Sequence, residues 1–156
     1  MSAKIAARLH SQGKKRMLAL DGGGTRGIIT IAFLKRIEAV LAERFVEKGW
    51  YARPEDFRLC HYFDLIGGTS VGSMLAAQLA LGHSVSEIET NFEATAKLIF
   101  SRPTMSAPRW GIFKPQFEAG PVTRAIKGIV QDECLDSDKL RTGLAIIMKR
   151  MDTGSV

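Results

Sequence analysis

Residues 68–72, GTSVG, have the residue types and the spacing of a serine nucleophile. They fit the pattern G-x-S-x-G and follow the apolar run FDLI. In a strand-turn-helix setting this pattern holds the serine in a strained turn above the sheet, and side chains at Gly68 and Gly72 would collide with neighbouring backbone. N–H groups at the start of the next helix would face a developing oxyanion. Ser70 is therefore a candidate nucleophile, although it could instead only cap the helix.

A second glycine-rich segment, DGGGTRG at residues 21–27, follows the apolar run MLAL. Gly22, Gly24 and Gly27 match G-x-G-x-x-G, the fingerprint of dinucleotide-binding domains. That fingerprint needs a second strand soon after the helix, with an acid about 20 residues on that binds the ribose. Glu43 stands at that distance but inside a long helical pattern, so cofactor binding is disfavoured. A P-loop is also disfavoured, because no G-K-[ST] ends the segment.

The two glycine segments are predicted to meet at one edge of a sheet. The first follows a short strand at Met17–Leu20 and the second follows one at Phe63–Ile66. Because both loops would leave the same ends of parallel strands, the bare N–H groups near Gly24 could face Ser70. Two such loops side by side predict an oxyanion hole.

Helical patterns separate the predicted strands. A long amphipathic helix is predicted over Gly27–Lys48, and a helix of small residues over Val71–Leu81 ends at Gly82. Ser84 and Glu87 form a capping-box pattern that opens a third helix. The residues expected on the buried face of the long helix are Phe33, Leu34, Ile37, Val40, Leu41 and Phe45, and those of the third helix are Val85, Ile88, Phe92, Ala96 and Ile99.

The second half of the chain continues the alternation. Residues 102–117 hold three prolines and are predicted to form a loop, Gly120 and Pro121 suit the start of a further helix, and Leu144–Met148 is the third strand candidate. The pattern predicts an α/β fold with three layers, in which helices cover both faces of a mostly parallel sheet. Because a turn signal at residues 152–155 calls for a partner strand, we expect the domain to be incomplete.

Composition limits the class of protein. The chain has 156 residues, 46% of them apolar and 24% charged, which is typical of one globular domain or part of one. There is no apolar run of about 18 residues and no signal-peptide core, and Cys60 and Cys134 suggest reduced thiols. We expect a cytoplasmic protein. Nucleic-acid binding is disfavoured, because the body of the chain has no basic stripe with interleaved aromatic residues.

The net charge of +6 is concentrated at the N-terminus. Residues 1–16 hold five basic residues and no acid, so they are predicted to be a basic tail that precedes a domain over residues 17–156. The tail could be drawn to an anionic membrane surface, where each basic side chain contributes about 1 kcal/mol. A solvated and partly disordered tail is the favoured interpretation.

DGGGTRG and FDLIGGTSVGSM, separated by a long helix, together closely resemble the patatin-like phospholipases, from about Met17 to the chain end. The resemblance implies a lipid acyl hydrolase with a serine and aspartate dyad and no metal or other cofactor. It implies that Ser70 is acylated and that the loop supplies oxyanion N–H groups. The residues concerned are Gly22, Gly23 and Gly24, with the N–H near Val71 and the motif glycines Gly27, Gly68 and Gly72. Arg26 matches a basic position of the family loop, where it could orient the loop or a lipid phosphate, or form a structural ion pair.

The expected base of the dyad is missing from the chain. In the family the aspartate lies in a D-G-[GA] motif far downstream of the serine, and no such motif follows Ser70. Asp21 belongs to the glycine loop, Asp152 lies in a D-T-G turn, and Asp64 is interpreted as a structural acid. His83 follows the serine but lies at the far end of the helix that begins there. We therefore expect the base beyond this chain and expect this chain alone to be inactive.

The sequence predicts a phospholipase A type hydrolase that acts on phospholipid or another acyl-ester lipid, with peripheral membrane contact. The aromatic residues Trp110, Phe113 and Phe117, interleaved with Arg109 and Lys114, could form a lipid-facing rim or could pack under a loop. A catalytically inert fragment or pseudoenzyme that binds lipid or a partner is the alternative. An esterase or thioesterase for other acyl substrates is a further one.

Overall fold

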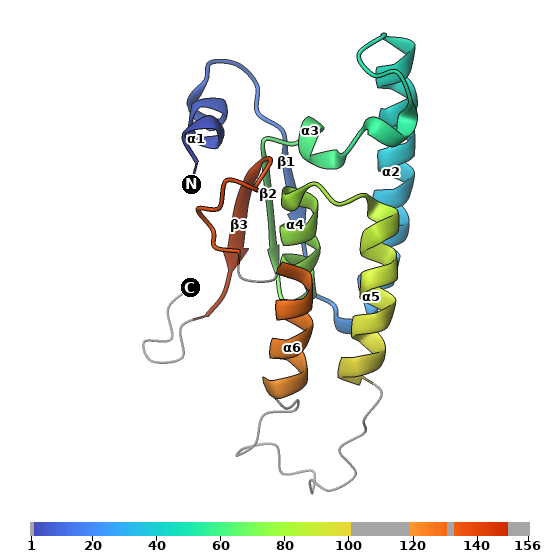
Figure 1. Cartoon of the computed structure of the whole chain (residues 1–156), viewed down its shortest axis with the longest axis vertical. Coiled ribbons are helices and arrows are strands. Elements are labelled where there is room, and N and C mark those ends of the chain that lie inside the picture. Colours follow the sequence, from blue (N-terminus) through green and yellow to red (C-terminus); the bar gives the residue numbers. More distant parts are fainter. Residues whose placement is uncertain (1, 101–118, 131–132, 150–156) are drawn as a thin grey trace, which may run out of the picture.

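A computed structural model of the chain describes residues 2–100, 119–130 and 133–149, and three parallel strands form its central sheet (Figure 1). The strands are β1 (Met17–Leu20), β2 (Leu65–Thr69) and β3 (Gly143–Ile147), in the order β1-β2-β3. Ile66 in β2 pairs with Leu18 of β1 on one side and with Leu144 of β3 on the other. The predicted α/β fold with a parallel sheet is confirmed.

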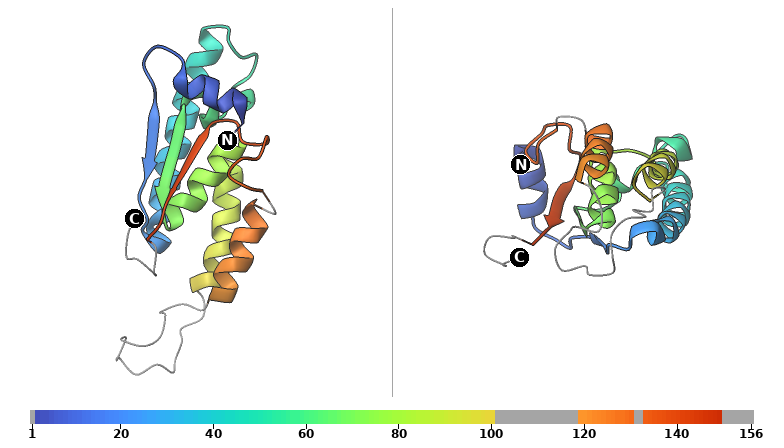
Figure 2. Two further views of the ribbon diagram at one scale, coloured as in Figure 1. Left: turned by 90° about the vertical axis from the view of Figure 1, so that its left-hand side faces the viewer. Right: turned by 90° about the horizontal axis from the view of Figure 1, so that it is seen from below.

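Helices cover mainly one face of this sheet. The helical segments are α1 (Ala3–His10), η1 (Gly24–Arg26), α2 (Gly27–Glu47), η2 (Pro54–Asp56), α3 (Leu59–Tyr62), α4 (Val71–Leu81), α5 (Val85–Phe100) and α6 (Ala119–Val130). Helices α2, α4, α5 and α6 lie together on one side of the sheet (Figures 1 and 2). Among the described residues, α1 reaches the other face, where Leu9 lies beside Gly143 and Leu65.

The local helix signals agree with the structure. Helix α2 begins at the predicted residue and ends one residue early, and α4 has the predicted bounds. Gly82 ends α4 in the left-handed conformation, with φ of 92°. The capping box is also present, because Ser84 N–H donates to the Glu87 carboxylate at 2.7 Å and Glu87 N–H donates to Ser84 Oγ at 3.2 Å.

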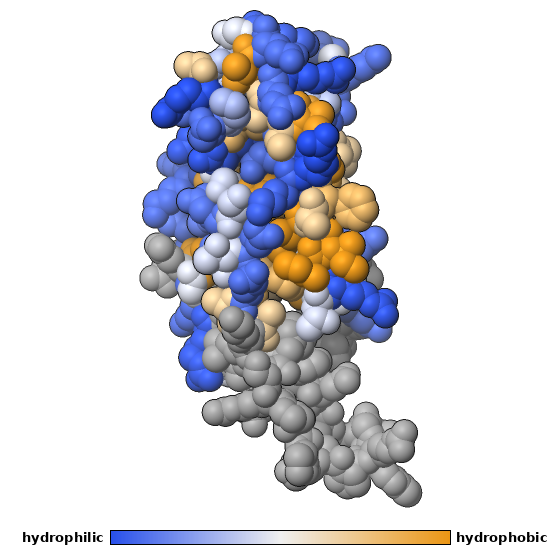
Figure 3. Space-filling model, turned by 90° about the vertical axis from the view of Figure 1, so that its right-hand side faces the viewer, coloured by the Kyte–Doolittle hydropathy of each residue, from blue (hydrophilic) through white to orange (hydrophobic). Residues whose placement is uncertain are grey.

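The buried face of α2 was predicted only in part. Leu34 is buried as expected, but Ile31 and Ala42 are the other buried apolar residues of this helix. Phe33 is 69% exposed, and Ile37 and Val40 are exposed as well, so the prediction for these three residues is wrong. The physical reason is that the neighbours of α2, chiefly α5 and η2, cover only part of its surface. Figure 3 views the molecule from the side of α2 and α5 and shows apolar side chains gathered on the surface there.

The expectation of a solvated N-terminal tail is also wrong for residues 3–10, which form α1, whereas residues 11–14 are exposed. Ile5 of α1 is only 3% exposed and packs near Leu140. Arg8 forms an ion pair with Asp64, with 2.8 Å between Nε and Oδ1, and donates to the carbonyl oxygens of Cys60 and Phe63. The net charge of residues 1–16 does not reveal this contact, because one Arg side chain can direct several donors to a carboxylate and to nearby carbonyl oxygens at once.

Asp64 is a structural acid, as predicted. Its Oδ2 accepts the backbone N–H of Arg16 at 2.8 Å. Burial alone would raise the pKa of Asp64, but the hydrogen bonds from Arg16 and Arg8 together hold this pKa below its ordinary value. Asp64 lies just before β2, which begins at Leu65, two residues later than predicted.

Several predictions lie outside the described residues. They concern the loop at residues 102–117 with its aromatic side chains, the side chain of Ile99 and the turn at residues 152–155. Within the described part, Cys60 and Cys134 are free thiols. None of the described helices is long and apolar enough to cross a membrane.

Candidate active site

Ser70 links β2 to α4 in a backbone conformation that side chains rarely adopt. Its φ is 50° and its ψ is −127°, and it is the one non-glycine residue with positive φ among those described. A residue held in such a region costs on the order of 1–3 kcal/mol, which the surrounding structure must offset. Ser70 is exposed, and within the described start of α4 its side chain makes no capping hydrogen bond. The helix-cap alternative is therefore not what the structure contains.

The two glycines of G-x-S-x-G have steric causes that the structure makes explicit. A Cβ on Gly68 would lie 2.4 Å from the backbone of Gly72. A Cβ on Gly72 would lie only 2.1 Å from the carbonyl oxygen of Leu20, at the end of β1. Any side chain at either position would thus push α4 away from the strands, and the turn that holds Ser70 would move with it.

The glycine loop after β1 lies directly against Ser70. A Cβ on Gly22 would be 2.7 Å from the Cβ of Ser70, and Gly22 N–H donates to Thr69 Oγ1 at 2.9 Å. Gly24 has φ of 56°, in the left-handed region. A Cβ on Gly27 would be 2.9 Å from Val71 Cγ1. The fold thus brings together the two glycine segments that the sequence placed at one sheet edge.

Two helical segments begin at the glycine loop and at the Ser70 turn. Val71 and Gly72 are the first residues of α4, and Gly24 is the first residue of η1. The first N–H groups of a helix have no partner within it, and they form the positive end of the helix dipole. The N–H of Gly22, in contrast, already donates to Thr69 Oγ1. Gly24 and Val71 are thus the residues at which helical segments begin after the glycine loop and after Ser70.

Ser73 is a residue of this site that the sequence analysis did not single out. Its Oγ donates to the carbonyl oxygen of Ser70 at 2.5 Å, and its backbone N–H donates to the same oxygen at 3.0 Å. The signal in the sequence is the spacing of three residues, which is one turn of helix. Ser73 thus stabilises the strained turn at Ser70.

Charged side chains of the described residues form no hydrogen bond with the side chain of Ser70. Within the described residues, Ser70 Oγ has no hydrogen bond to a carboxylate or an imidazole, and Asp64 lies at the opposite end of β2 from Ser70. Arg26 is exposed at the residue before α2 and is not part of the ion pairs formed among described residues. No group of three or more His, Cys, Asp or Glu side chains in the described part could hold a metal ion.

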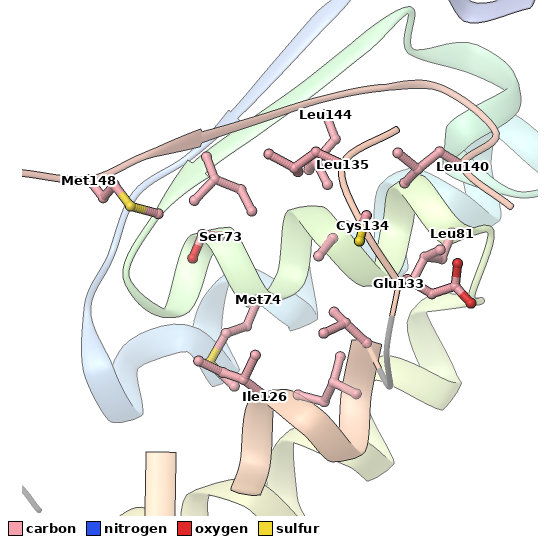
Figure 4. A pocket seen from close by; sticks show the side chains of 14 residues that line it. Ser73, Met74, Leu81, Ile126, Glu133, Cys134, Leu135, Leu140, Leu144 and Met148 are labelled. Atoms are coloured by element: carbon pink, nitrogen blue, oxygen red, sulfur yellow. The ribbon is translucent and has the colours of Figure 1, made fainter. Parts of the chain in front are cut away.

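An apolar cavity of about 310 Å³ lies beside the turn, between α4, α6 and β3. Figure 4 shows Ser73, Met74 and Met148 at one end of it, and Leu81 and Leu140 toward the other. Ser73 places the near end of the cavity one helical turn from Ser70. Its volume is in the range of sites that bind small ligands.

Known proteins resemble this chain over most of its length. The family described as "Patatin-like phospholipase" matches residues 18–154. A "cGAMP-activated phospholipase" of Vibrio cholerae is 34% identical over 154 residues, which are 93% of this chain and 41% of that protein. A second one, of Escherichia coli, is 36% identical over 133 residues, 81% of this chain and 34% of that protein.

Plant proteins match a shorter part. "Patatin-17" of Solanum cardiophyllum is 42% identical over 64 residues, which are 41% of this chain and 15% of that protein. The chain thus spans about two fifths or less of the length of each of these relatives. The family match includes both glycine segments and nearly the whole described sheet, and the chain belongs to the patatin-like phospholipase family.

Proposed function

We propose that the full-length protein containing this chain is a phospholipase A type hydrolase with Ser70 as its nucleophile. The observation that carries the proposal is the backbone of Ser70, strained at φ of 50° and exposed beside the glycine loop. Such strain clusters at sites where it holds a reactive group in place. Similarity to two proteins described as phospholipases supports the same reaction class.

In the proposed reaction, Ser70 Oγ attacks the carbonyl carbon of an acyl ester while a base accepts its proton. The family resemblance implies an aspartate from outside this chain as that base. The C–O bond to the lipid alcohol then breaks, and the alcohol takes a proton as it leaves. Water hydrolyses the acyl-serine, which releases the fatty acid and restores Ser70.

The proposed set of oxyanion donors is smaller than the set expected from the sequence. We assign the role to the N–H groups of Gly23, Gly24 and Val71, at the starts of η1 and α4. Gly22 would act differently, because its N–H donates to Thr69 Oγ1 and so ties the loop to β2. Loss of one oxyanion donor typically lowers kcat by about 10²–10³-fold.

The apolar cavity is the proposed binding site of the acyl chain. Its lining is almost entirely aliphatic, and Ser73 at its near end bonds to the residue that would attack the ester. Glu133 lies at the other end, where Lys139 and Ser137 bind its carboxylate, which keeps this charge outside the apolar part. An acyl chain in the cavity would place its ester at the Ser70 end.

Regulation by a nucleotide is a further part of the proposal. The two bacterial relatives described above are cGAMP-activated, and a third, of Escherichia coli, is described as a "cUMP-AMP-activated phospholipase" and is 35% identical over 92 residues. We therefore propose that a cyclic dinucleotide activates the full-length protein.

The test uses the full-length protein, phosphatidylglycerol vesicles and a fluorophosphonate probe, with and without cGAMP or cUMP-AMP. Fatty-acid release and serine labelling should both disappear in Ser70→Ala. Ser86→Ala, which removes an exposed hydroxyl from α5, is the matched control and should behave as the unchanged protein. Labelling that persists in Ser70→Ala would refute the nucleophile. No labelling of the unchanged protein under any condition would favour an inert lipid-binding protein.

A further inference from the structure

A second cavity, of about 390 Å³, lies at the end of the sheet opposite to Ser70. Arg16, just before β1, and Tyr62, at the end of α3, contribute to its wall. In a parallel sheet the segments that precede the strands meet at one edge, whereas Ser70 follows β2 at the other edge. The other lining residues belong to the last turns of α2, to the segment that follows it and to α3. Figure 1 shows where these elements lie.

The wall of this cavity carries positive charge and no carboxylate. Arg16, Arg44 and Lys48 line it, and no Asp or Glu does. Within the described part of the chain, none of these three cations belongs to an ion pair. Several positive charges around one concave surface raise the local concentration of anions. The cavity is therefore suited to an anionic ligand.

Histidine adds a neutral donor to this wall. Nδ1 of His61 lies 3.0 Å from Tyr51 Oη and accepts the backbone N–H of Arg58 at 3.2 Å. Burial, and after it the positive charges of Arg141 and other arginines, lowers the pKa of His61. Because Nδ1 accepts the Arg58 N–H, the proton of the neutral ring is on Nε2.

Aromatic rings form the other half of the wall. They belong to Phe45, Trp50, Tyr51, Phe57 and Tyr62. Trp50 is 65% exposed although it is large and apolar, and its ring stacks on Phe45 with 4.9 Å between centroids. Exposed flat rings beside cations are the combination that binds nucleotides, because bases stack on the rings and phosphates pair with Arg and Lys.

The cations lie against these rings. Lys48 Nζ is 5.2 Å from the ring centroid of Trp50, and Arg16 Cζ is 4.6 Å from that of Tyr62. Long cationic side chains can leave an exposed ring for a phosphate at small cost, since an exposed cation-π contact is weak. Their departure would uncover the ring faces for a base.

A purely structural role can explain the positions of only some of the cations and rings in this cavity. Arg44 and Lys48 stand at the C-terminal end of α2, where cations complement the helix dipole. That explanation does not cover Arg16, which reaches the same cavity from the start of β1, or the exposed ring of Trp50.

We propose that this cavity binds a nucleotide, with its base on the rings of Trp50 and Tyr62 and its phosphates between Arg16, Arg44 and Lys48. Only the choice of a nucleotide as the ligand rests on the proposed nucleotide activation; the location of the site does not. Helix α2 connects the two sites, because it begins directly after the glycine loop and ends at the cavity. Its 21 residues span about 30 Å at the usual helical rise. Binding at one end could thus bias the position of the loop at the other end.

The experiment measures binding of cGAMP and cUMP-AMP to the full-length protein by calorimetry. Arg44→Gln and Trp50→Leu should each weaken Kd about tenfold or more, the loss of one charged or stacking contact. Arg36→Gln removes the same charge from the exposed surface of α2 outside the cavity, and it should leave Kd unchanged. Thermal melts identify any variant that fails to fold, and Lys48→Gln replaces it.

The outcomes separate this inference from the proposed reaction. Ser70→Ala should lose hydrolysis but bind the nucleotide with unchanged Kd. Absence of binding by the unchanged protein would overturn the inference, as would cavity variants that bind as tightly as it does. It would also be overturned if these variants kept nucleotide binding and instead lost binding to phosphatidylglycerol vesicles. An unchanged protein that binds but never hydrolyses lipid would refute only the proposed reaction.

Discussion

Replacement of Gly72 by alanine tests the close approach on which the Ser70 turn depends. A Cβ at this position would lie 2.1 Å from the carbonyl oxygen and 2.7 Å from the carbonyl carbon of Leu20, and 2.8 Å from the oxygen of Asp21. All three are backbone atoms at the end of β1, so none can rotate away. Since ordinary contact begins near 3.4 Å, the separation must grow by 3.4 − 2.1 = 1.3 Å.

The cost of this movement is set by the packing of α4. The helix is anchored by the buried residues Leu75, Ala76, Leu79 and Ala80, and such an overpacked site costs about 3 kcal/mol. For a domain of this size that lowers Tm by about 6–12 °C. Because Ser70 and the Val71 N–H would move with α4, we also expect acyl hydrolysis by the full-length protein to fall about 10²-fold.

The matched control is Gly128→Ala in α6. A Cβ there meets no atom within 4 Å, so the change should be neutral or should stabilise the helix by up to about 1 kcal/mol. Both variants are measured by thermal unfolding and by fatty-acid release. If Gly72→Ala melts within 1–2 °C of the unchanged protein and keeps its activity, the close packing of α4 on β1 is wrong.

Three further changes test the strain and the buried charges. Ser70→Gly should abolish hydrolysis yet raise the free energy of unfolding by about 1 kcal/mol, because glycine adopts positive φ without strain; a lower Tm would contradict this. Asp64→Asn should destabilise the protein by about 2 kcal/mol at pH 7, through loss of the Arg8 and Arg16 bonds. Since the folded pKa of Asp64 is lowered, the difference in free energy of unfolding between the unchanged protein and Asp64→Asn should shrink as pH falls through this pKa. Urea unfolding that shows an equal difference at pH 7 and pH 3 would contradict the ion pair of Asp64 with Arg8. Burial raises the pKa of Glu38, so its ionisation should destabilise the folded protein. The free energy of unfolding of Glu38→Gln should therefore rise relative to that of the unchanged protein as pH rises from 4 to 7. A relative fall over this range would refute the prediction.

Signals that act within a few residues were sufficient to predict much of the fold. The glycine after α4, the capping box at Ser84 and the apolar period of α2 each predicted a helix boundary to within a residue. These signals work because helix ends are stabilised by groups three or four residues away. The strand predicted to begin at Phe63 begins two residues later, at Leu65, and the side chain of Asp64 just before it binds the distant Arg8.

Contacts between distant segments could not be predicted in this way. Arg8 and Asp64 are 56 residues apart in sequence, and nothing local to α1 shows that it docks rather than stays in solvent. The apolar period of α2 likewise shows that the helix has an apolar stripe, but the neighbours decide which residues are covered. Phe33 and Ile37 are exposed for that reason.

The sequence by itself determined that Ser70 stands in a G-x-S-x-G turn, because few residue types fit such a turn. It also predicted a second glycine segment beside this turn, because both segments follow strands of one parallel sheet. Only the tertiary structure decided why Gly72 is needed, since the atoms that exclude a Cβ there belong to Leu20, the last residue of β1, and to Asp21, which follows it. It also decided that Arg16, Arg44 and Trp50 share one cavity. Their meeting depends on how a helix end packs against the start of a strand, and no periodicity in the chain encodes that.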